Sequence, residues 1–254
     1  SSGGGIDCFM NSSPTIQDCV IRNNGPVTNG GGIRCWIGCN PTITGCTISG
    51  NTANNSGGGI CCYKSNPAIT DCTISGNTAF EGGGIYCEYS SPALDDCTIS
   101  GNTTIDGYGG GIYCTYSSPT ITDCEITGNT APYAGGIRCW HSHPTISGCM
   151  ITDNWGSNGY GGGIYCSYSS PTITVCEIAG NATNSDGGGI YCASSNPAVT
   201  HCRIENNTSA NDGGGIFCGV NSQPQISDCV IAGNTANGAG GGIWCYQNAQ
   251  ITGC

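Results

Sequence analysis

Cysteine is the residue type in this chain with the most potential for chemistry. There are 22 cysteines among 254 residues, and twenty of them occupy two positions of a repeated pattern. The first column is Cys8, Cys35, Cys62, Cys87, Cys114, Cys139, Cys166, Cys192, Cys218 and Cys245, and the second is Cys19, Cys46, Cys72, Cys97, Cys124, Cys149, Cys176, Cys202, Cys229 and Cys254. A metal or haem site would need clustered ligands, but the sequence has no CxxC motif and only three histidines. The cysteine density therefore predicts a disulfide framework in an oxidising compartment.

Two ways of pairing these cysteines are open. Pairing inside each repeat, as in Cys8 with Cys19, would close loops of about 11 residues. Pairing between neighbouring repeats also fits, since stacked strands lie about 4.8 Å apart. The one-to-one match of the two columns favours pairing inside each repeat. Cys39 and Cys61 lie outside both columns, and Cys61 stands at the outward position that Tyr occupies most often, so it is a candidate for a bridge to Cys39 or to another molecule.

The carboxylates offer a second kind of chemistry. Asp71, Asp96 and Asp123 share one repeat position, and Asp95 and Glu125 lie close to them in sequence. Like charges stacked about 4.8 Å apart would repel, which suggests a bound Ca²⁺ or raised pKa values. The alternative is that each Asp caps a turn before its cysteine. No basic residue accompanies the cluster, so we expect no enzyme activity, and calcium is the one candidate cofactor.

Aromatic residues form columns that face outward. Trp36, Tyr63 and Trp140 share one position, Tyr89, Tyr116 and Tyr168 a second, and Tyr86, Tyr113, Tyr165 and Tyr191 a third. Aromatic rows of this kind can stack on sugars or pack against another rod. They are also common as ordinary strand-surface residues, because aromatic side chains favour strands. We take the residues of the first two columns, Trp36, Tyr63, Trp140, Tyr89, Tyr116 and Tyr168, as the candidate surface-binding set.

The elements that position these columns follow from the repeat. A Gly-Gly-Ile or closely similar segment recurs every 25 to 27 residues, with its Ile at positions 6, 33, 60, 85, 112, 137, 164, 190, 216 and 243. Each repeat holds three short β-like runs, such as GGGIYC, PTITDC and CTISGN, with apolar residues in alternation. The pattern predicts an all-β, right-handed parallel β-helix (β-solenoid) of about ten coils, with three short strands each and essentially no helix. Residues 1–254 form one domain, a rod about 45–50 Å long.

Stacking places equivalent residues of successive coils in columns. We expect the two Cys columns and three Ile columns to face inward. A column of asparagines should lie at a corner, where stacked amides can bond from coil to coil. Its members are Asn24, Asn51, Asn77, Asn102, Asn129, Asn154, Asn181, Asn207 and Asn234.

Composition excludes several classes of function. The net charge is −11, with only five Lys and Arg residues, so nucleic acid is not an expected partner. No stretch approaches the roughly 18 apolar residues of a membrane-spanning helix. His141 and His143 precede Pro144 without a nearby carboxylate in the repeat, and we expect them in a solvated loop rather than a metal site.

The pairing of GGGI with ISGN carries a family resemblance. Gly58-Gly59-Ile60 and Ile74-Ser75-Gly76-Asn77, and their equivalents in other coils, resemble the GGA-I and F-x-x-N tetrapeptides of polymorphic outer membrane protein repeats. The chain is also similar to other right-handed parallel β-helix repeat proteins of bacterial surfaces. The resemblance covers essentially the whole chain. It implies a secreted or surface-displayed passenger that is used in adhesion.

The ends of the chain suggest an assembly. A solenoid normally caps its terminal strand edges, but the first coil starts directly at GGGI and the last stops at Cys254. Both ends are thus uncapped, which predicts either head-to-tail stacking or a piece of a longer rod. The first hypothesis is an extracellular structural protein that forms or belongs to a surface filament, with itself as partner. The alternative is a cell-surface adhesin that binds glycans through an aromatic face.

Overall fold

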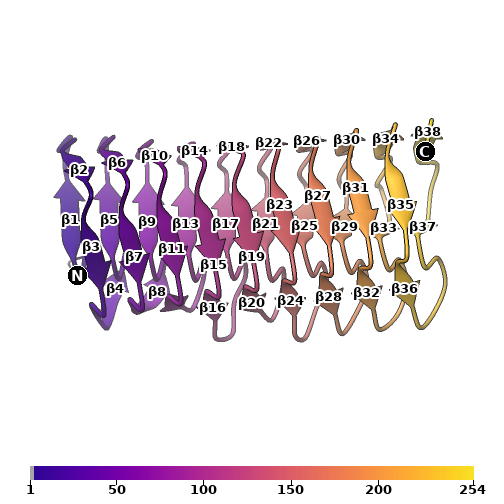
Figure 1. The fold of residues 1–254 in the computed structure, drawn as a ribbon, viewed down its shortest axis with the longest axis horizontal. Coiled ribbons are helices and arrows are strands. Elements are labelled where there is room, and N and C mark those ends of the chain that lie inside the picture. The colour runs from indigo at the N-terminus through magenta and orange to yellow at the C-terminus, as the bar shows by residue number, and fades with distance from the viewer. Residues whose placement is uncertain (1–2) are drawn as a thin grey trace.

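The strands of this chain stack side by side along a single rod, with the N-terminus near one end and the C-terminus at the other (Figure 1). The structure is a computed structural model that describes residues 3–254. Every strand pair is parallel, and no helix occurs among the described residues. The expected parallel β-helix is confirmed.

Two sheets run the whole length of the rod, and each has ten strands. The first sheet contains β1 (Ile6–Phe9), β5 (Ile33–Trp36), β9 (Ile60–Tyr63), β13 (Ile85–Glu88), β17 (Ile112–Thr115), β21 (Ile137–Trp140), β25 (Ile164–Ser167), β29 (Ile190–Ala193), β33 (Ile216–Cys218) and β37 (Ile243–Cys245). The second contains β2 (Thr15–Gln17), β6 (Thr42–Thr44), β10 (Ala68–Thr70), β14 (Ala93–Asp95), β18 (Thr120–Thr122), β22 (Thr145–Ser147), β26 (Thr172–Thr174), β30 (Ala198–Thr200), β34 (Gln225–Ser227) and β38 (Gln250–Thr252).

The third sheet has nine strands: β3 (Val20–Arg22), β7 (Thr47–Ser49), β11 (Thr73–Ser75), β15 (Thr98–Ser100), β19 (Glu125–Thr127), β23 (Met150–Thr152), β27 (Glu177–Ala179), β31 (Arg203–Glu205) and β35 (Val230–Ala232). In all three sheets equivalent residues pair in register, such as Ile60 with Ile85.

A fourth line of short strands was not expected from the sequence. It comprises the pair β4 (Val27–Asn29) and β8 (Ala53–Ser56), and a seven-stranded sheet of β12 (Thr78–Ala79), β16 (Thr103–Thr104), β20 (Thr130–Ala131), β24 (Trp155–Gly156), β28 (Ala182–Thr183), β32 (Thr208–Ser209) and β36 (Thr235–Ala236). The strands of the seven-stranded sheet are two residues long, too short to show an alternating pattern.

The core is a stack of Ile and Cys side chains, as the alternation predicted. Ile60, Ile69 and Ile74 are fully buried in one coil, together with Cys62 and Cys72. The same five positions are buried through most of the rod. Each coil therefore contributes a thin apolar layer, and stability depends on stacking many layers.

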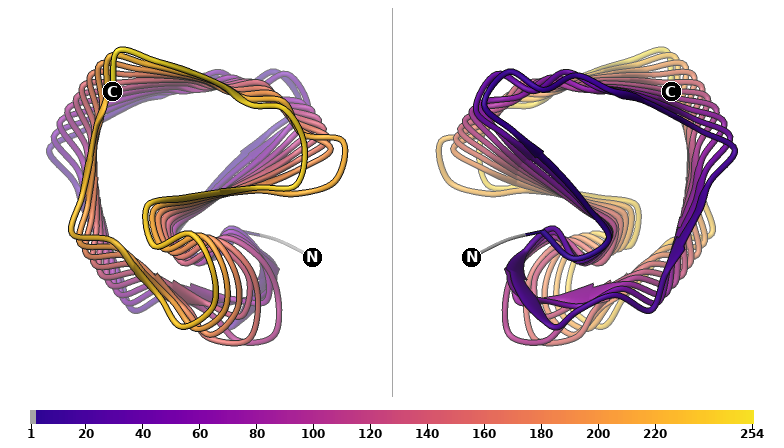
Figure 2. Two further views of the ribbon diagram at one scale, coloured as in Figure 1. Left: turned by 90° about the vertical axis from the view of Figure 1, so that its right-hand side faces the viewer. Right: turned by 90° about the vertical axis from the view of Figure 1, so that its left-hand side faces the viewer.

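Each coil bends inward just before the first sheet, which gives the rod an indented cross-section (Figure 2). The bend needs a left-handed residue, and Gly57 adopts it with φ 67°. The next glycine lies against the following coil, because a Cβ on Gly58 would be 2.5 Å from the carbonyl oxygen of Gly83. The glycine run before each strand of the first sheet thus makes both the bend and the close stacking possible.

Buried polar ladders join the coils at the corners. The Asn51 amide nitrogen donates to Oδ1 of Asn77 at 3.0 Å and to the carbonyl oxygen of Ile21 at 2.9 Å. The expected asparagine ladder is confirmed. A serine ladder at another corner works in the same way, and there the backbone N–H of Ser65 donates to Oγ of Ser90 at 3.0 Å. These side chains satisfy backbone groups where the sheet hydrogen bonds are interrupted.

Candidate binding face

The six aromatic residues that the sequence selected belong to one connected cluster. Rings of successive coils are in contact in the order Trp36, Tyr63, Tyr89, Tyr116, His141 and Tyr168, with centroids 4.4 to 6.3 Å apart; all these pairs are stacked except Tyr63 and Tyr89, which meet edge to face. Trp140 packs against Tyr116 and His141. We call these seven residues the aromatic ridge. It begins on the first sheet and continues along the corner that follows that sheet.

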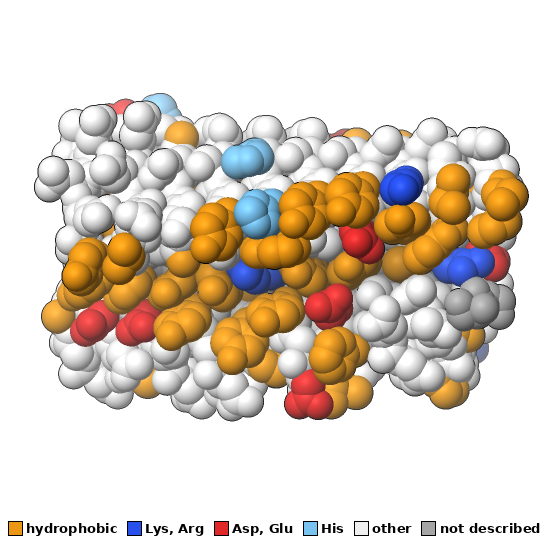
Figure 3. All heavy atoms as spheres, turned by 180° about the vertical axis from the view of Figure 1, so that it is seen from behind, with side chains coloured by type: hydrophobic (Ala, Val, Ile, Leu, Met, Phe, Trp, Pro, Cys, Tyr) orange, Lys and Arg blue, Asp and Glu red, His pale blue; other side chains and the backbone are white. Residues whose placement is uncertain are grey.

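The ridge is ordered by stacking but remains accessible. Tyr89 and Tyr116 lie nearly parallel, with 9° between their planes, and both are about half exposed. Figure 3 shows rows of hydrophobic side chains along this face of the rod, with acidic, basic and histidine side chains between and beside them. A continuous exposed aromatic surface of this kind is typical of a binding site.

His141 lies in an exposed loop after β21, as expected, and it is also a member of the ridge. Its ring is exposed, yet it stacks between Tyr116 and Tyr168 with 5° between the planes on each side. His143 is also exposed, and its Nδ1 accepts a hydrogen bond from the backbone N–H of Ser170 at 3.0 Å. The alignment of His141 with Tyr89 in the repeat was the signal that could have placed it here.

A second aromatic row lies beside the ridge, in the indentation of the coil. We call it the aromatic groove. It contains Tyr86, Tyr113, Tyr165, Tyr191, Phe217 and Trp244 from the first sheet, together with Tyr108, Tyr133 and Tyr160 from the loops after the fourth line of strands. Tyr86 and Tyr113 are largely buried although they point away from the core, because the inward bend brings these loops against them.

A cavity of about 310 Å³ in the groove is lined by Tyr108, Tyr113, Arg138 and Trp140. Trp140 belongs to the ridge, so the cavity joins the two aromatic rows. The Arg138 guanidinium carbon lies 3.6 Å from the ring centroid of Tyr165 and 5.4 Å from that of Tyr108. This arrangement combines aromatic rings, phenol hydroxyls and one cation, which are the groups that bind polar organic ligands.

The aspartate column lies at a different corner, between the second and third sheets. Asp71, Asp96 and Asp123 have left-handed backbones with φ of 50° to 52°, and Gly148 takes the same conformation in its coil. This fits the turn interpretation of these residues. Among residues 3–254, no group of three or more His, Cys, Asp or Glu side chains has a geometry that could hold a metal ion. The calcium site stays a prediction.

All 22 cysteines lie in the described part of the chain, and each is a free thiol in the structure. Sulfur atoms interact along a column from coil to coil, as in the hydrogen bond between the thiols of Cys139 and Cys166. That hydrogen bond and burial raise the pKa of Cys139 well above its ordinary value. The favoured pairing of Cys8 with Cys19 is not formed in the structure, where both are free thiols and the thiol of Cys8 interacts with that of Cys35 in the next coil. Disulfide formation stays a prediction.

The second cysteine column has a structural task of its own. The backbone N–H of Cys46 lies 3.4 Å from Sγ of Cys72, and the carbonyl oxygen of Thr70 lies 3.2 Å from the same sulfur. At this corner the thiol therefore accepts from one backbone N–H and donates to one backbone carbonyl, as the side chains of the serine and asparagine ladders do. No signal in the sequence distinguishes such a ladder from a row of disulfides.

The two unmatched cysteines are explained by their neighbours. Cys39 occupies the serine ladder, where its N–H donates to Oγ of Ser65 at 3.1 Å and its thiol donates to the carbonyl oxygen of Trp36 at 3.3 Å. Cys61 packs with Tyr86 at the base of the groove, where burial raises its pKa to about 12. The expected bridge between Cys39 and Cys61 is not formed.

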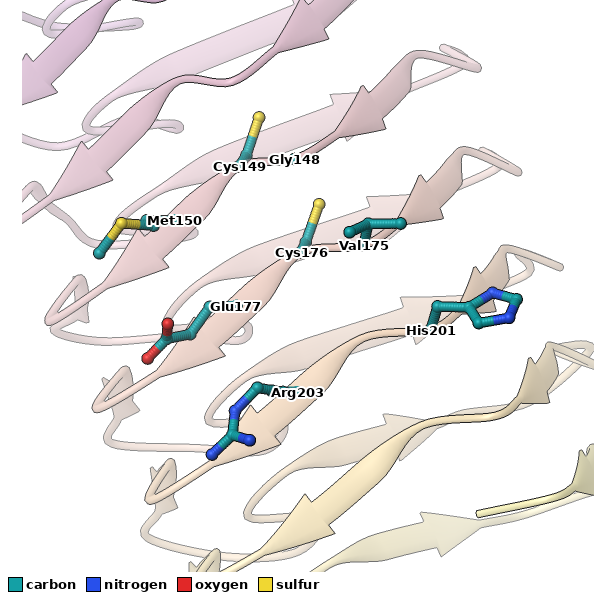
Figure 4. Close-up of a pocket in the computed structure, with 8 residues that line it drawn as sticks. All are labelled: Gly148, Cys149, Met150, Val175, Cys176, Glu177, His201 and Arg203. Atoms are coloured by element: carbon teal, nitrogen blue, oxygen red, sulfur yellow. The ribbon is translucent and has the colours of Figure 1, made fainter.

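A second hollow, of about 260 Å³, lies over the third sheet (Figure 4). Met150, Glu177 and Arg203 line it from successive coils. The sulfur of Cys176 points away from these side chains, and the ring of His201 does not approach it (Figure 4). Cys176 is 2% exposed, so this pair does not form an accessible nucleophile and base.

The fold and the aromatic columns together define a parallel β-helix repeat protein. Residues 1–142 and 95–254 match the family model described as right handed beta helix region, and the two matches together span the chain. The protein therefore belongs to the right-handed β-helix family. No curated protein and no solved structure matches it. None of the described residues forms a helix long and apolar enough to cross a membrane.

Proposed function

We propose that this protein is a non-enzymatic glycan-binding module displayed outside the cell, which holds a saccharide chain on its aromatic ridge and groove. The observation that carries the proposal is the continuous row of ring contacts from Trp36 to Tyr168, in which Tyr89, Tyr116, His141 and Tyr168 are exposed, beside a cavity lined in part by Tyr113 and Trp140. Aromatic rings provide apolar contact for sugar rings, and the tyrosine hydroxyls can bond to sugar hydroxyls.

The shape of the site supports an extended ligand. The ridge crosses several coils of a rigid rod, so it presents similar groups at regular intervals. A polymer with repeated units can contact such a row at many points at once, and its weak contacts add through effective concentration. A compact ligand would use only one cavity.

Asp95 and Asp96, the carboxylates that the sequence selected next to each other, do not support catalysis at the ridge. Asp95 ends β14 in the second sheet, and Asp96 makes the turn that follows. They lie outside the ridge, whereas Glu88 of β13 is in register with Tyr63 of the ridge. Acid–base chemistry on a bound sugar would need such groups within hydrogen-bond reach of the ligand.

Display at a surface is supported by the resemblance of the GGI and ISGN segments to polymorphic outer membrane protein repeats, which implies an adhesive passenger. The cysteine density is a weaker argument for an oxidising compartment than the sequence alone suggested. Buried thiols such as Cys72 and Cys139 have hydrogen-bonding tasks in the reduced state.

Glycan-array binding with purified protein tests the proposal, followed by titration of the best oligosaccharide. Trp36→Ala and Trp140→Ala should each weaken binding about tenfold or more, because each removes ring contact from the ridge. Trp155→Ala is a matched control. Trp155 lies in β24 of the fourth line of strands, is 37% exposed and is not part of the ridge. Equal binding by all three variants, or no saccharide binding by the wild-type protein, would overturn the proposal.

Head-to-tail assembly into a filament is a second candidate. The terminal strands β1 and β37 of the first sheet each pair with a single neighbour, so each has an edge that can accept another strand. Negative-stain electron microscopy without reductant, over a concentration series, should then show threads with an axial repeat of about 45–50 Å. Short isolated rods at every concentration would contradict assembly by this chain alone.

A further inference from the structure

Two strands of the first sheet have the same sequence, Ile-Arg-Cys-Trp, but their arginines differ in partners. Arg34 of β5 donates to both carboxylate oxygens of Asp7 in the preceding coil, at 2.8 and 2.7 Å. Arg138 of β21 pairs in register with Tyr113 of the preceding coil. Among residues 3–254, no carboxylate lies within 4 Å of the Arg138 guanidinium.

Arg138 is nevertheless buried, with 5% of its surface exposed. Its Nη1 donates to the carbonyl oxygen of Cys139 at 3.1 Å and more weakly to that of Tyr165 at 3.4 Å. Its Nε is buried without a hydrogen-bond partner in the described residues. A buried charge normally has a counter-ion, so this cation and its unused donor are unusual.

The arginine lines the cavity of about 310 Å³ with Tyr108, Tyr113 and Trp140. This volume is at the lower end of the range of small-molecule sites, roughly 300–1,000 Å³, and suits one sugar residue rather than a folded partner. The nearby rings partly compensate the charge through cation–π contact. An anion in the cavity would complete the compensation.

We infer that the cavity at Arg138 is an anion subsite, which takes the carboxylate of one acidic sugar in an otherwise neutral saccharide. The inference rests on the proposed glycan-binding function for the rest of the ligand. A carboxylate is favoured because a hydrogen bond between an arginine and an ionised group is stronger than one between neutral groups. A densely charged polyanion is disfavoured, since the protein has a net charge of −11 and one such cation in the groove.

Isothermal titration with two trisaccharides tests the subsite. One ends in glucuronic acid, and the other has glucose in its place. The acidic trisaccharide should bind about tenfold tighter to the wild-type protein, as expected for a charged hydrogen-bonded pair. Arg138→Gln should remove this preference. Arg34→Gln is the matched control and should retain it, because Arg34 is already engaged by Asp7.

The outcomes separate this inference from the proposed function. Equal affinity of the wild-type protein for the two sugars would overturn the subsite and leave glycan binding standing. If neither sugar binds but glucuronic acid alone does so through Arg138, the site takes a free anion, which overturns the saccharide assignment. The comparison of the two sugars uses only the wild-type protein, so it stays decisive even if Arg138→Gln does not fold.

Discussion

Strands β5 and β21 have identical residues and the same place in the first sheet, four coils apart. Their inward halves are equivalent, since Ile33 and Ile137 are both fully buried and stacked against isoleucines of neighbouring coils. Their outward halves are not. The Arg34 side chain is held by Asp7, whereas the equivalent side chain of β21 faces an aromatic cavity.

The comparison teaches that a coil's interior and its surface obey different rules. The interior repeats because each coil must match the next, and any departure would leave a gap or a clash. The surface depends on which residues the preceding coil and the nearby loop supply. Tyr108 reaches the Arg138 cavity from a loop one coil earlier. The same tetrapeptide can therefore be a structural ion pair or part of a binding site.

The largest expected effect concerns the cysteines that both strands share. A hydrogen bond to the thiol of the next coil, together with burial, raises the pKa values of Cys35 and Cys139 well above the ordinary 9.0. A raised folded-state pKa means that stability is complete below pH 9 and falls as the pH rises, because only the unfolded state releases the protons. Each such thiol loses about 1.4 kcal/mol per pH unit above that value.

Urea denaturation in reductant should therefore show a midpoint that falls steeply as the pH rises above 9. A midpoint that does not move with pH would contradict the raised pKa values of these thiols. Ellman titration of the unfolded protein, prepared without reductant, gives an independent count of thiols.

A smaller effect should separate the two arginines. Asp7→Asn leaves Arg34 buried without its counter-ion and should lower the free energy of unfolding by about 1–2 kcal/mol at pH 7. Arg138→Gln removes a cation that has no carboxylate partner, so its effect should be near zero or stabilising. Equal losses in the two variants, measured by urea denaturation, would contradict the contrast between the strands.

The pH dependence of the Asp7 variant sharpens the same test. Burial alone would raise the pKa of Asp7, but hydrogen bonds from Arg34 and the Gly3 backbone lower it below the ordinary 3.8. A lowered folded-state pKa gives stability that is present above pH 3.8 and is lost as the pH falls through the folded value. The difference between wild type and Asp7→Asn should shrink accordingly under acid conditions, with Trp155→Ala as an unresponsive control.

The smallest effect is expected at the corner that follows each strand. Cys39 follows β5, and Ser142 follows β21 in the same ladder, where its hydroxyl donates to the carbonyl oxygen of Trp140 at 2.8 Å. Cys39→Ser should change the free energy of unfolding by less than about 0.5 kcal/mol, because the hydroxyl can replace the thiol. A much larger loss in thermal denaturation would mean that Cys39 has a covalent role that the ladder does not describe.

Much of the fold could be predicted because its cause is periodic. The alternation of apolar residues set the inward columns, and the 25–27-residue repeat predicted coils in register. The fourth line of strands was missed because its members are so short. The place of His141 in the aromatic ridge was not expected, because histidine was considered as a metal ligand or base and not as an aromatic ring aligned with Tyr89.

The candidate site was predictable only in part. All six selected aromatic residues fall in the ridge, because equal repeat positions must stack. The groove could not be predicted, since Tyr86 and Tyr113 were expected on an open strand surface. They are buried by loops that the inward bend at Gly57 and its equivalents carries back over the sheet.

The sequence by itself thus determined the number of coils, the order of the first three sheets and the inward Ile, Cys and Asn columns. These properties depend on local alternation and on a repeat that is visible in one dimension. The tertiary structure alone decided which thiols meet, which arginine has a counter-ion and where a cavity opens. Those properties depend on contacts between residues about 25 to 30 positions apart, at coil surfaces where the repeat no longer restricts the residue type.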